Sequence, residues 1–169
     1  PTKSSAASDV YKRQDKTLRE IYLPPYKTAI AADVKTIMAS FNSIRGEKCH
    51  GSKYILTDLL KEELGFEGFV VSDWAGIDEI PGDYKQDVIN GVNAGIDMVM
   101  VPGIMEGQNQ EHYKTFIKFL IEAVNEGSVS IKRIDDAVRR ILKVKMELGL
   151  FEDPYIDDSH FNKIGSLEH

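Results

Sequence analysis

The chain has 169 residues, of which 42% are hydrophobic and 28% are charged, and its formal net charge at pH 7 is -6. This length and composition suffice for one folded domain with a core, and they exclude an intrinsically disordered chain. The negative charge excludes a basic surface for nucleic acid, and no apolar run approaches the roughly 20 residues of a membrane helix. We therefore expect neither nucleic acid nor a membrane as a partner.

Both ends of the chain look foreign to the fold. Residues 1–14, PTKSSAASDVYKRQ, are polar, lack a periodic apolar pattern and resemble translated adapter sequence. The last five residues, GSLEH, resemble a restriction-site and affinity-tag scar. We expect the domain to occupy residues 15–157, and residues 158–169 to be the start of a linker followed by this scar.

The first part of the domain predicts helices around one strand. Pro24 and Pro25 interrupt the first helical pattern, so we expect a short segment ending at Leu23 and a new helix over 24–32. The apolar run 36–41 predicts a strand, and a polar loop over 42–51 follows it. A helix capped by Ser52 then carries one apolar stripe, which consists of Leu56, Leu59, Leu60 and Leu64.

Residues 69–74, FVVSDW, form the most informative stretch. A continuous apolar strand ends there on a hydroxyl, a carboxylate and an indole. A strand without polar alternation is buried on both faces, which is typical of a parallel sheet covered by helices, and a carboxylate at its C-terminal end faces the open crevice of such a sheet. Asp73 is therefore the first candidate for a catalytic group.

Three helices and a strand complete the pattern. We expect a helix over 84–94 that ends at Gly95, a buried strand over 97–101, a helix over 110–126 and a last helix capped by Ser130. Its predicted inward face consists of Ile134, Ala137, Val138, Ile141, Leu142 and Leu148. Its predicted outward face consists of Lys132, Arg133, Arg139, Arg140 and Lys143.

The alternation of strands and helices predicts right-handed βαβ units and a parallel sheet. About three strands do not close a barrel, since a (β/α)8 barrel takes ~250 residues. The predicted fold class is therefore α/β, a partial (β/α)8 TIM-type barrel of about three parallel strands with their helices, as a fragment of something larger. Its exposed strand edges lead us to expect self-association into a homo-oligomer.

Four strings resemble glycoside hydrolase family 3, and within it the bacterial β-glucosidases and exo-β-glucan glucohydrolases. They are TIMASFNSIRGEKCHGSKYILTDLLKEELGFEGFVVSDW from Thr36, AGIDMVMVP from Ala94, IKRIDDAVRRIL from Ile131 and GLFEDPY from Gly149. The resemblance implies that the chain is the C-terminal part of the family's N-terminal barrel domain. Gly76-Ile77-Asp78 after SDW resembles the glucosidase branch rather than the β-N-acetylglucosaminidase branch.

The resemblance implies a retaining β-glycosidase, which uses one carboxyl group as nucleophile and a second as acid/base. Asp73 matches the family's nucleophile, and Trp74 resembles the indole that lines the subsite of the leaving sugar. The family places its acid/base glutamate on a second domain, downstream of this chain. We therefore expect a β-linked glucoside or oligosaccharide as substrate, no metal or organic cofactor, and little activity of the chain alone. Localisation stays open, with a secreted or periplasmic parent as one expectation.

Phe41 and Arg45 are the further predicted substrate-binding residues. Phe41 ends its strand where many relatives have tyrosine, so it is expected to form a subsite wall. Arg45 lies in the polar loop, where it and His50 either reach the crevice or belong to a solvated basic surface. Three loop acids are weaker candidates for a position near Asp73, namely Glu79, Asp83 and Glu106.

Each main candidate has a plainer interpretation. Asp73 is alternatively a helix N-cap or a loop residue whose role is to form hydrogen bonds, and Trp74 is alternatively a core residue. Asp97 stands at the N-terminal end of its strand, which predicts a structural role. For the whole chain, the alternatives are a non-catalytic, self-associating barrel fragment or scaffold module, and a phosphosugar barrel enzyme. The latter lacks its expected phosphate loop after the strand over 97–101.

Overall fold

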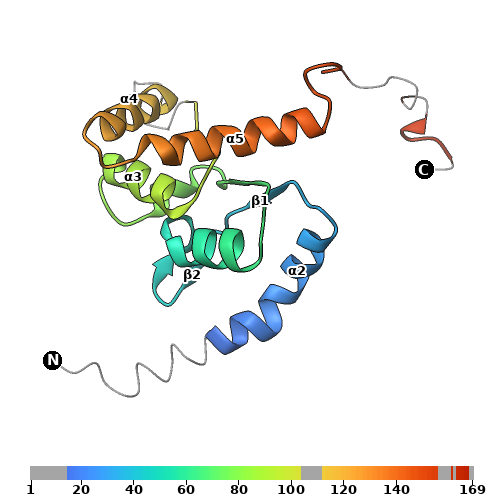
Figure 1. Ribbon diagram of the computed structural model, residues 1–169, viewed down its shortest axis with the longest axis horizontal. Coiled ribbons are helices and arrows are strands. Elements are labelled where there is room, and N and C mark those ends of the chain that lie inside the picture. Colours follow the sequence, from blue (N-terminus) through green and yellow to red (C-terminus); the bar gives the residue numbers. More distant parts are fainter. Residues whose placement is uncertain (1–14, 104–111, 156–160, 162, 168–169) are drawn as a thin grey trace.

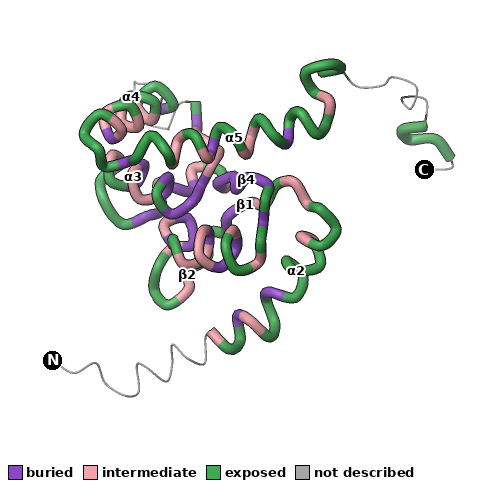
Figure 2. Tube along the Cα trace, in the orientation of Figure 1, coloured by how far each residue is buried: buried purple, intermediate pink, exposed green. Residues whose placement is uncertain are grey.

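Two short parallel strands, β1 (Thr36–Met38) and β4 (Phe69–Val71), lie at the centre of the computed structural model (Figure 1). The structure describes residues 15–103, 112–155, 161 and 163–167. All three residues of β4 are buried, as the uninterrupted apolar run predicts (Figure 2). The predicted tail over 1–14 and the loop acid Glu106 lie outside the described residues.

The predicted third strand is present only as an extended segment beside β4. Val71 and Met98 form a single parallel bridge. The Met98 N–H donates to Val70 O over 3.1 Å, and the Ser72 N–H donates to Met98 O over 2.9 Å. In the described part of the chain these strands do not close a barrel, so the fold is the expected partial α/β barrel.

Helices cover this small sheet. The N-terminal side carries a π-type turn, η1 (Leu18–Tyr22), which runs into α2 (Leu23–Ala31), and a π-type helix, η3 (Tyr54–Glu63), follows β1. On the other side lie α3 (Tyr84–Ala94), α4 (His112–Asn125) and α5 (Ile131–Glu147), with α2 at the opposite side of the strands in Figure 1. None of the described helices is both long and apolar enough to span a membrane.

The predicted polar loop over 42–51 has regular structure. It contains an antiparallel hairpin of β2 (Ser43–Ile44) and β3 (Glu47–Lys48), followed by a 3-10 turn, η2 (Cys49–Gly51). The predicted cap by Ser52 is wrong, because its hydroxyl donates instead to the Glu47 carboxylate over 2.6 Å. The predicted cap of α5 is confirmed, since the Ser130 hydroxyl accepts the Arg133 N–H over 3.2 Å.

The predicted faces of α5 are partly wrong. Val138, Leu142 and Leu148 are 43–57% exposed, whereas Ala137 is buried as predicted. Arg140, predicted to point outward, donates through one guanidinium nitrogen to Phe66 O and Gly68 O, over 3.0 and 2.9 Å. The reason is that Arg140 lies near the N-terminal end of β4, where backbone carbonyls need donors, and a long arginine reaches them while its stem covers apolar surface.

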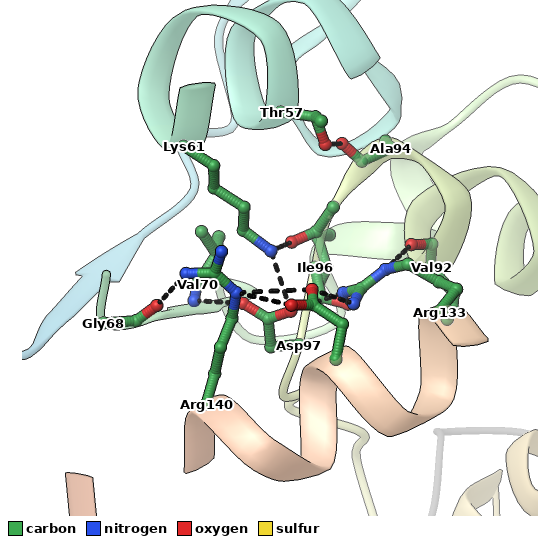
Figure 3. Close-up of polar contacts among 12 residues, drawn as sticks. Thr57, Lys61, Gly68, Val70, Val92, Ala94, Ile96, Asp97, Arg133 and Arg140 are labelled. Carbon is green, nitrogen blue, oxygen red and sulfur yellow. Dashed lines mark hydrogen bonds and ion pairs between the residues drawn. The ribbon is translucent and has the colours of Figure 1, made fainter. Parts of the chain in front are cut away.

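Asp97 lies at the centre of this contact (Figure 3). Its side chain is fully buried and accepts hydrogen bonds from the Val70 N–H and from Lys61 Nζ, each over 2.8 Å. Arg133, also predicted to point outward, forms an ion pair with the same carboxylate and donates to Val92 O. The structural role predicted for Asp97 is thus confirmed, because one carboxylate joins η3, β4 and α5.

Candidate active site

Asp73 is held directly after β4 by hydrogen bonds to its backbone carbonyl. Its carbonyl oxygen accepts the Ser72 hydroxyl over 2.8 Å and the Gly76 N–H over 3.0 Å. Ser72 is fully buried, and its hydroxyl in turn accepts the Met100 N–H over 2.8 Å. The end of the strand is therefore tied to the neighbouring extended segment, which gives the Asp73 backbone a defined position.

Asp73 is partly exposed. Its Oδ1 accepts the N–H of Trp74 over 2.7 Å, which fixes the orientation of the carboxyl plane. The side chain does not cap a described helix, so the interpretation as a helix cap is wrong. Its bond with the Trp74 N–H is instead a loop hydrogen bond of the kind that the other plain interpretation named. A partly solvated carboxylate with one oxygen held by a backbone donor is suited to act as a nucleophile.

Two aromatic side chains lie at the same edge of the sheet. Trp74 is 61% exposed and Phe41 is 41% exposed, so neither is a core residue. They share an edge because β1 and β4 run parallel and each aromatic follows the C-terminal end of its strand. Exposed aromatic faces beside a carboxylate combine apolar and polar surface, as ligand sites do.

His50 is a residue of the site that the sequence left undecided between a crevice and a solvated loop. It is fully buried in η2, and its Nε2 accepts the backbone N–H of Asp73 over 3.0 Å. The Phe41 ring lies 5.5 Å from the His50 ring, centroid to centroid, at a tilt of 50°. The only sequence signal for this burial was the place of His50 directly before a helix whose apolar stripe faces the sheet.

Burial lowers the pKa of the His50 imidazole. The negative charge of Asp73 opposes this shift, Lys48 adds to it, and the Ser40 carbonyl and Glu79 oppose it more weakly. A neutral ring that accepts through Nε2 carries its proton on Nδ1.

The described contacts of Arg45 are with residues other than Asp73. Its guanidinium forms an ion pair with Asp15 over 2.8 Å and lies 4.9 Å from the centroid of the Tyr54 ring. It lines a mostly apolar cavity of about 740 Å³ between α2, β1 and η3, to which Asp73 and Trp74 do not contribute. A contact between Arg45 and substrate stays a prediction, and it requires the pair with Asp15 to open.

The described loop acids already have partners. Glu79 forms an ion pair with Lys48 over 3.2 Å, and the Asp83 carboxylate caps α3 by accepting the Gln86 N–H over 2.9 Å. Asp78 binds His112 through Nε2 over 3.0 Å, and the His112 ring stacks on Tyr84 at 4.2 Å. Among the residues that the structure describes, no group of three or more histidine, cysteine or acidic side chains is placed to hold a metal ion.

Asp87 is a buried carboxylate close to this cluster. Burial, together with the charges of Asp78 and Asp83, raises its pKa to about 6. Its Oδ1 has no hydrogen-bond partner among the described residues, and the same is true of Asp78 Oδ1 and the Tyr84 hydroxyl. The loop after Trp74 thus contacts α3 and α4 through a cluster of acidic groups, in which burial and the charges of Asp78 and Asp83 raise the pKa of Asp87.

Comparison with known proteins gives consistent results. Residues 2–144 match the family described as glycosyl hydrolase family 3 N terminal domain. The chain is 34% identical over 139 residues to a periplasmic beta-glucosidase of Salmonella typhimurium, covering 79% of this chain and 17% of that protein. It is 36% identical over 151 residues to a beta-glucosidase of Rhizobium radiobacter, covering 89% of this chain and 16% of that protein.

Solved structures show the same relationship. An exo-1,3/1,4-beta-glucanase from a Pseudoalteromonas species superposes with a TM-score of 0.78 at 38% identity, covering 91% of this chain and 19% of that one. A beta-glucosidase from Listeria innocua in complex with glucose superposes with a TM-score of 0.71 at 31% identity, covering 89% and 20%. The chain spans less than a quarter of the length of each of these four proteins. On the match over residues 2–144, this chain belongs to glycosyl hydrolase family 3.

Proposed function

We propose that this chain supplies the nucleophilic aspartate, Asp73, of a retaining β-glucosidase or exo-β-glucanase. The observation that carries the proposal is the place of Asp73, a partly exposed residue just beyond the C-terminal end of a buried parallel strand, next to the exposed Trp74. This end of the strands is where barrel enzymes place catalytic groups. Relatives named beta-glucosidase, and a neighbour solved with glucose, support β-glucosides as the substrate class.

The proposed reaction has two steps. In the first, an oxygen of the Asp73 carboxylate attacks the anomeric carbon, the bond from that carbon to the leaving oxygen breaks, and an acid group protonates the leaving oxygen. In the second, a water molecule deprotonated by the same group attacks the anomeric carbon and releases Asp73. The Trp74 N–H holds Oδ1 and leaves Oδ2 as the attacking atom. The rings of Trp74 and Phe41 would pack on the sugar.

Leaving-group protonation is the step for which the described residues offer no free carboxyl group in the loop after β4. Glu79 is paired with Lys48, and Asp83 caps α3. We therefore infer that the chain alone is nearly inactive on ordinary glucosides, because attack without protonation forgoes much of the acceleration. Turnover of an aryl β-glucoside by the isolated chain at the rate of a complete family 3 enzyme would contradict this inference.

An activated substrate tests the nucleophile without the acid. 2-Deoxy-2-fluoro-β-glucosyl fluoride has a leaving group that needs no protonation, and its fluorine slows breakdown of the ester. We expect intact-mass measurement to show one added fluoroglucosyl group, and peptide mapping to place it on Asp73. Asp73→Asn should abolish the adduct, whereas Glu79→Gln, on the same loop, should keep it. No adduct, or an adduct on another carboxylate, would overturn the proposal.

A second candidate function is that of a non-catalytic, self-associating barrel fragment. The observation that favours it is the free edge of β1, which pairs only with β4 among the described strands and leaves Met38 47% exposed. We expect a dimer by analytical ultracentrifugation, and a monomer after Met38→Lys, because a charge on an edge strand opposes pairing. A monomeric wild-type chain at high concentration would rule this candidate out.

A further inference from the structure

We propose that His50 is a positioning residue for Asp73, whose backbone N–H it accepts, so that one buried imidazole fixes the loop that presents the nucleophile. This inference rests on the proposed role of Asp73. His50 itself touches neither the carboxyl group of Asp73 nor the exposed face of Trp74 through any described hydrogen bond, so it would act through the backbone.

The contact between the two residues is specific. Asp73 lies just beyond β4, where its N–H needs an acceptor outside the strand pairing, and Nε2 of His50 supplies it over 3.0 Å. His50 comes from η2, 23 residues earlier in the chain, and is fully buried. Among the described residues, Nδ1 is buried without a hydrogen-bond partner. The Asp73 N–H is therefore the directional contact that positions the ring, and the Ser40 carbonyl acts on it only more weakly.

The loop after Asp73 folds back against the same ring. A Cβ on Gly76 would lie 2.2 Å from Nε2 of His50, so only glycine allows this approach. Ala75, which lies between Asp73 and Gly76 in the sequence, has a left-handed φ of 52°. The Gly76 N–H closes the turn by donating to Asp73 O over 3.0 Å. The backbone of Asp73 is thus held at its nitrogen by His50 and at its carbonyl oxygen by Gly76.

His50 also connects the ends of the two central strands. Phe41, which follows β1, lies against one side of the imidazole at 5.5 Å between centroids. Asp73, which follows β4, is bonded to the ring edge. His50 is therefore a side-chain contact shared by the Phe41 ring and the Asp73 backbone, in addition to the direct pairing of β1 with β4. A displacement of about 1 Å at a reacting group is enough to slow a reaction about 100-fold.

The pKa of His50 supports this assignment. An acceptor at Nε2 requires the unprotonated form, and burial shifts the pKa of His50 in the direction that keeps the ring neutral. The charged groups that act on the ring are Asp73 and Glu79, which favour the protonated form, and Lys48, which disfavours it. Protonation would place two donors, Nε2–H and the Asp73 N–H, against each other.

The test compares two variants of His50 whose side-chain amides differ in length. In His50→Gln the side-chain oxygen reaches the former position of Nε2 and accepts the Asp73 N–H, whereas in His50→Asn it stops at the position of Nδ1. Cys49→Ala, next to His50 in the same buried turn, is the control for general disturbance. The first readout is the rate of Asp73 labelling by 2-deoxy-2-fluoro-β-glucosyl fluoride. The second is hydrogen exchange of the Asp73 amide, which does not depend on any reaction.

We expect His50→Asn to slow labelling by about 10- to 100-fold and to speed exchange of the Asp73 amide. His50→Gln and Cys49→Ala should stay within a few-fold of the wild-type chain in both. Equal labelling rates for the Asn and Gln variants would overturn the inference while leaving Asp73 as the nucleophile. Absence of labelling in the wild-type chain would instead remove the proposed function, and this inference with it. If the Asn variant does not fold, the protection factor of the wild-type Asp73 amide, which corrects for the intrinsic pH dependence of exchange, must fall as His50 is protonated, and an unchanged protection factor would overturn the proposal.

Discussion

The ammonium group of Lys61 lies 2.8 Å from the carboxylate of Asp97, and these side chains are 6% and 0% exposed. Their separation in sequence is 36 residues, so the pair joins η3 to the segment beside β4. Arg133 of α5 completes the cluster on the same carboxylate. A buried cluster of two cations and one anion is the polar contact on which the packing of three elements depends (Figure 3).

Asp97→Asn should therefore destabilise the domain strongly. Removing the carboxylate leaves Lys61 buried without its counter-charge, while Arg133 keeps its ion pair with Asp136, and loss of one partner of a buried pair costs about 3–5 kcal/mol. Urea denaturation at pH 7 measures this change. Lys143→Met is the matched control, since Lys143 pairs with Glu67 at an exposed site and should cost less than about 1 kcal/mol. Equal effects of the two substitutions would contradict the structural role of Asp97.

Lys61 predicts a pH dependence of stability. Burial lowers its pKa to about 8 from an ordinary value of 10.5. Between these two values the unfolded chain binds more protons than the folded one, so the free energy of unfolding rises with pH from about 8 to about 10.5 through this group. Lys61→Met should remove this rise. The measurement is urea denaturation at pH 8 and pH 10, and an unchanged slope in the variant would count against the lowered pKa.

Asp87 predicts the opposite dependence at acid pH. Its pKa is raised to about 6, above the ordinary 3.8, so the folded state binds the proton more tightly. The stability from this group is fully present below about pH 4 and is lost as pH rises through about 6. Asp87→Asn should stabilise the domain at pH 7, by about 1–3 kcal/mol, and make little difference at pH 4. A pH-independent effect would show that burial does not perturb this carboxyl group.

Gly76→Ala should disturb the site by contact with His50. Its new Cβ would lie 2.2 Å from Nε2, which forces the loop or the ring to move and costs about 1–3 kcal/mol. Labelling of Asp73 should slow at the same time. Gly103→Ala is the control, because no described atom lies within 4 Å of its Cβ. A Gly76 variant with wild-type stability and labelling would contradict the tight packing of the loop on His50.

Trp74 allows binding and folding to be separated. It is the single tryptophan of the chain and is 61% exposed, so its fluorescence reports directly on the proposed sugar surface. We expect a β-linked gluco-oligosaccharide to change this fluorescence in a saturable way. Trp74→Ala should slow labelling of Asp73 while changing the free energy of unfolding by less than about 0.5 kcal/mol. A large loss of stability would assign the indole to the core instead.

The order of helices and the central strand could be predicted because they depend on local sequence. The run Phe69-Val70-Val71 is apolar throughout, and Asp73 follows it directly, so both the burial of β4 and the place of the carboxylate at its end follow from residues adjacent in the chain. Ser130 was correctly expected to cap α5 for the same reason, since a cap involves only the next turn.

The sequence by itself thus determined the α/β pattern, the buried strand and the carboxylate–indole pair at its end. Only the tertiary structure decided that His50 is buried against Asp73. It also decided that Arg133 turns inward to the Asp97 carboxylate, and Arg140 to backbone carbonyls. A polar side chain is buried where a distant segment offers a hydrogen-bond partner, and neither hydrophobic periodicity nor spacing records which segment that is.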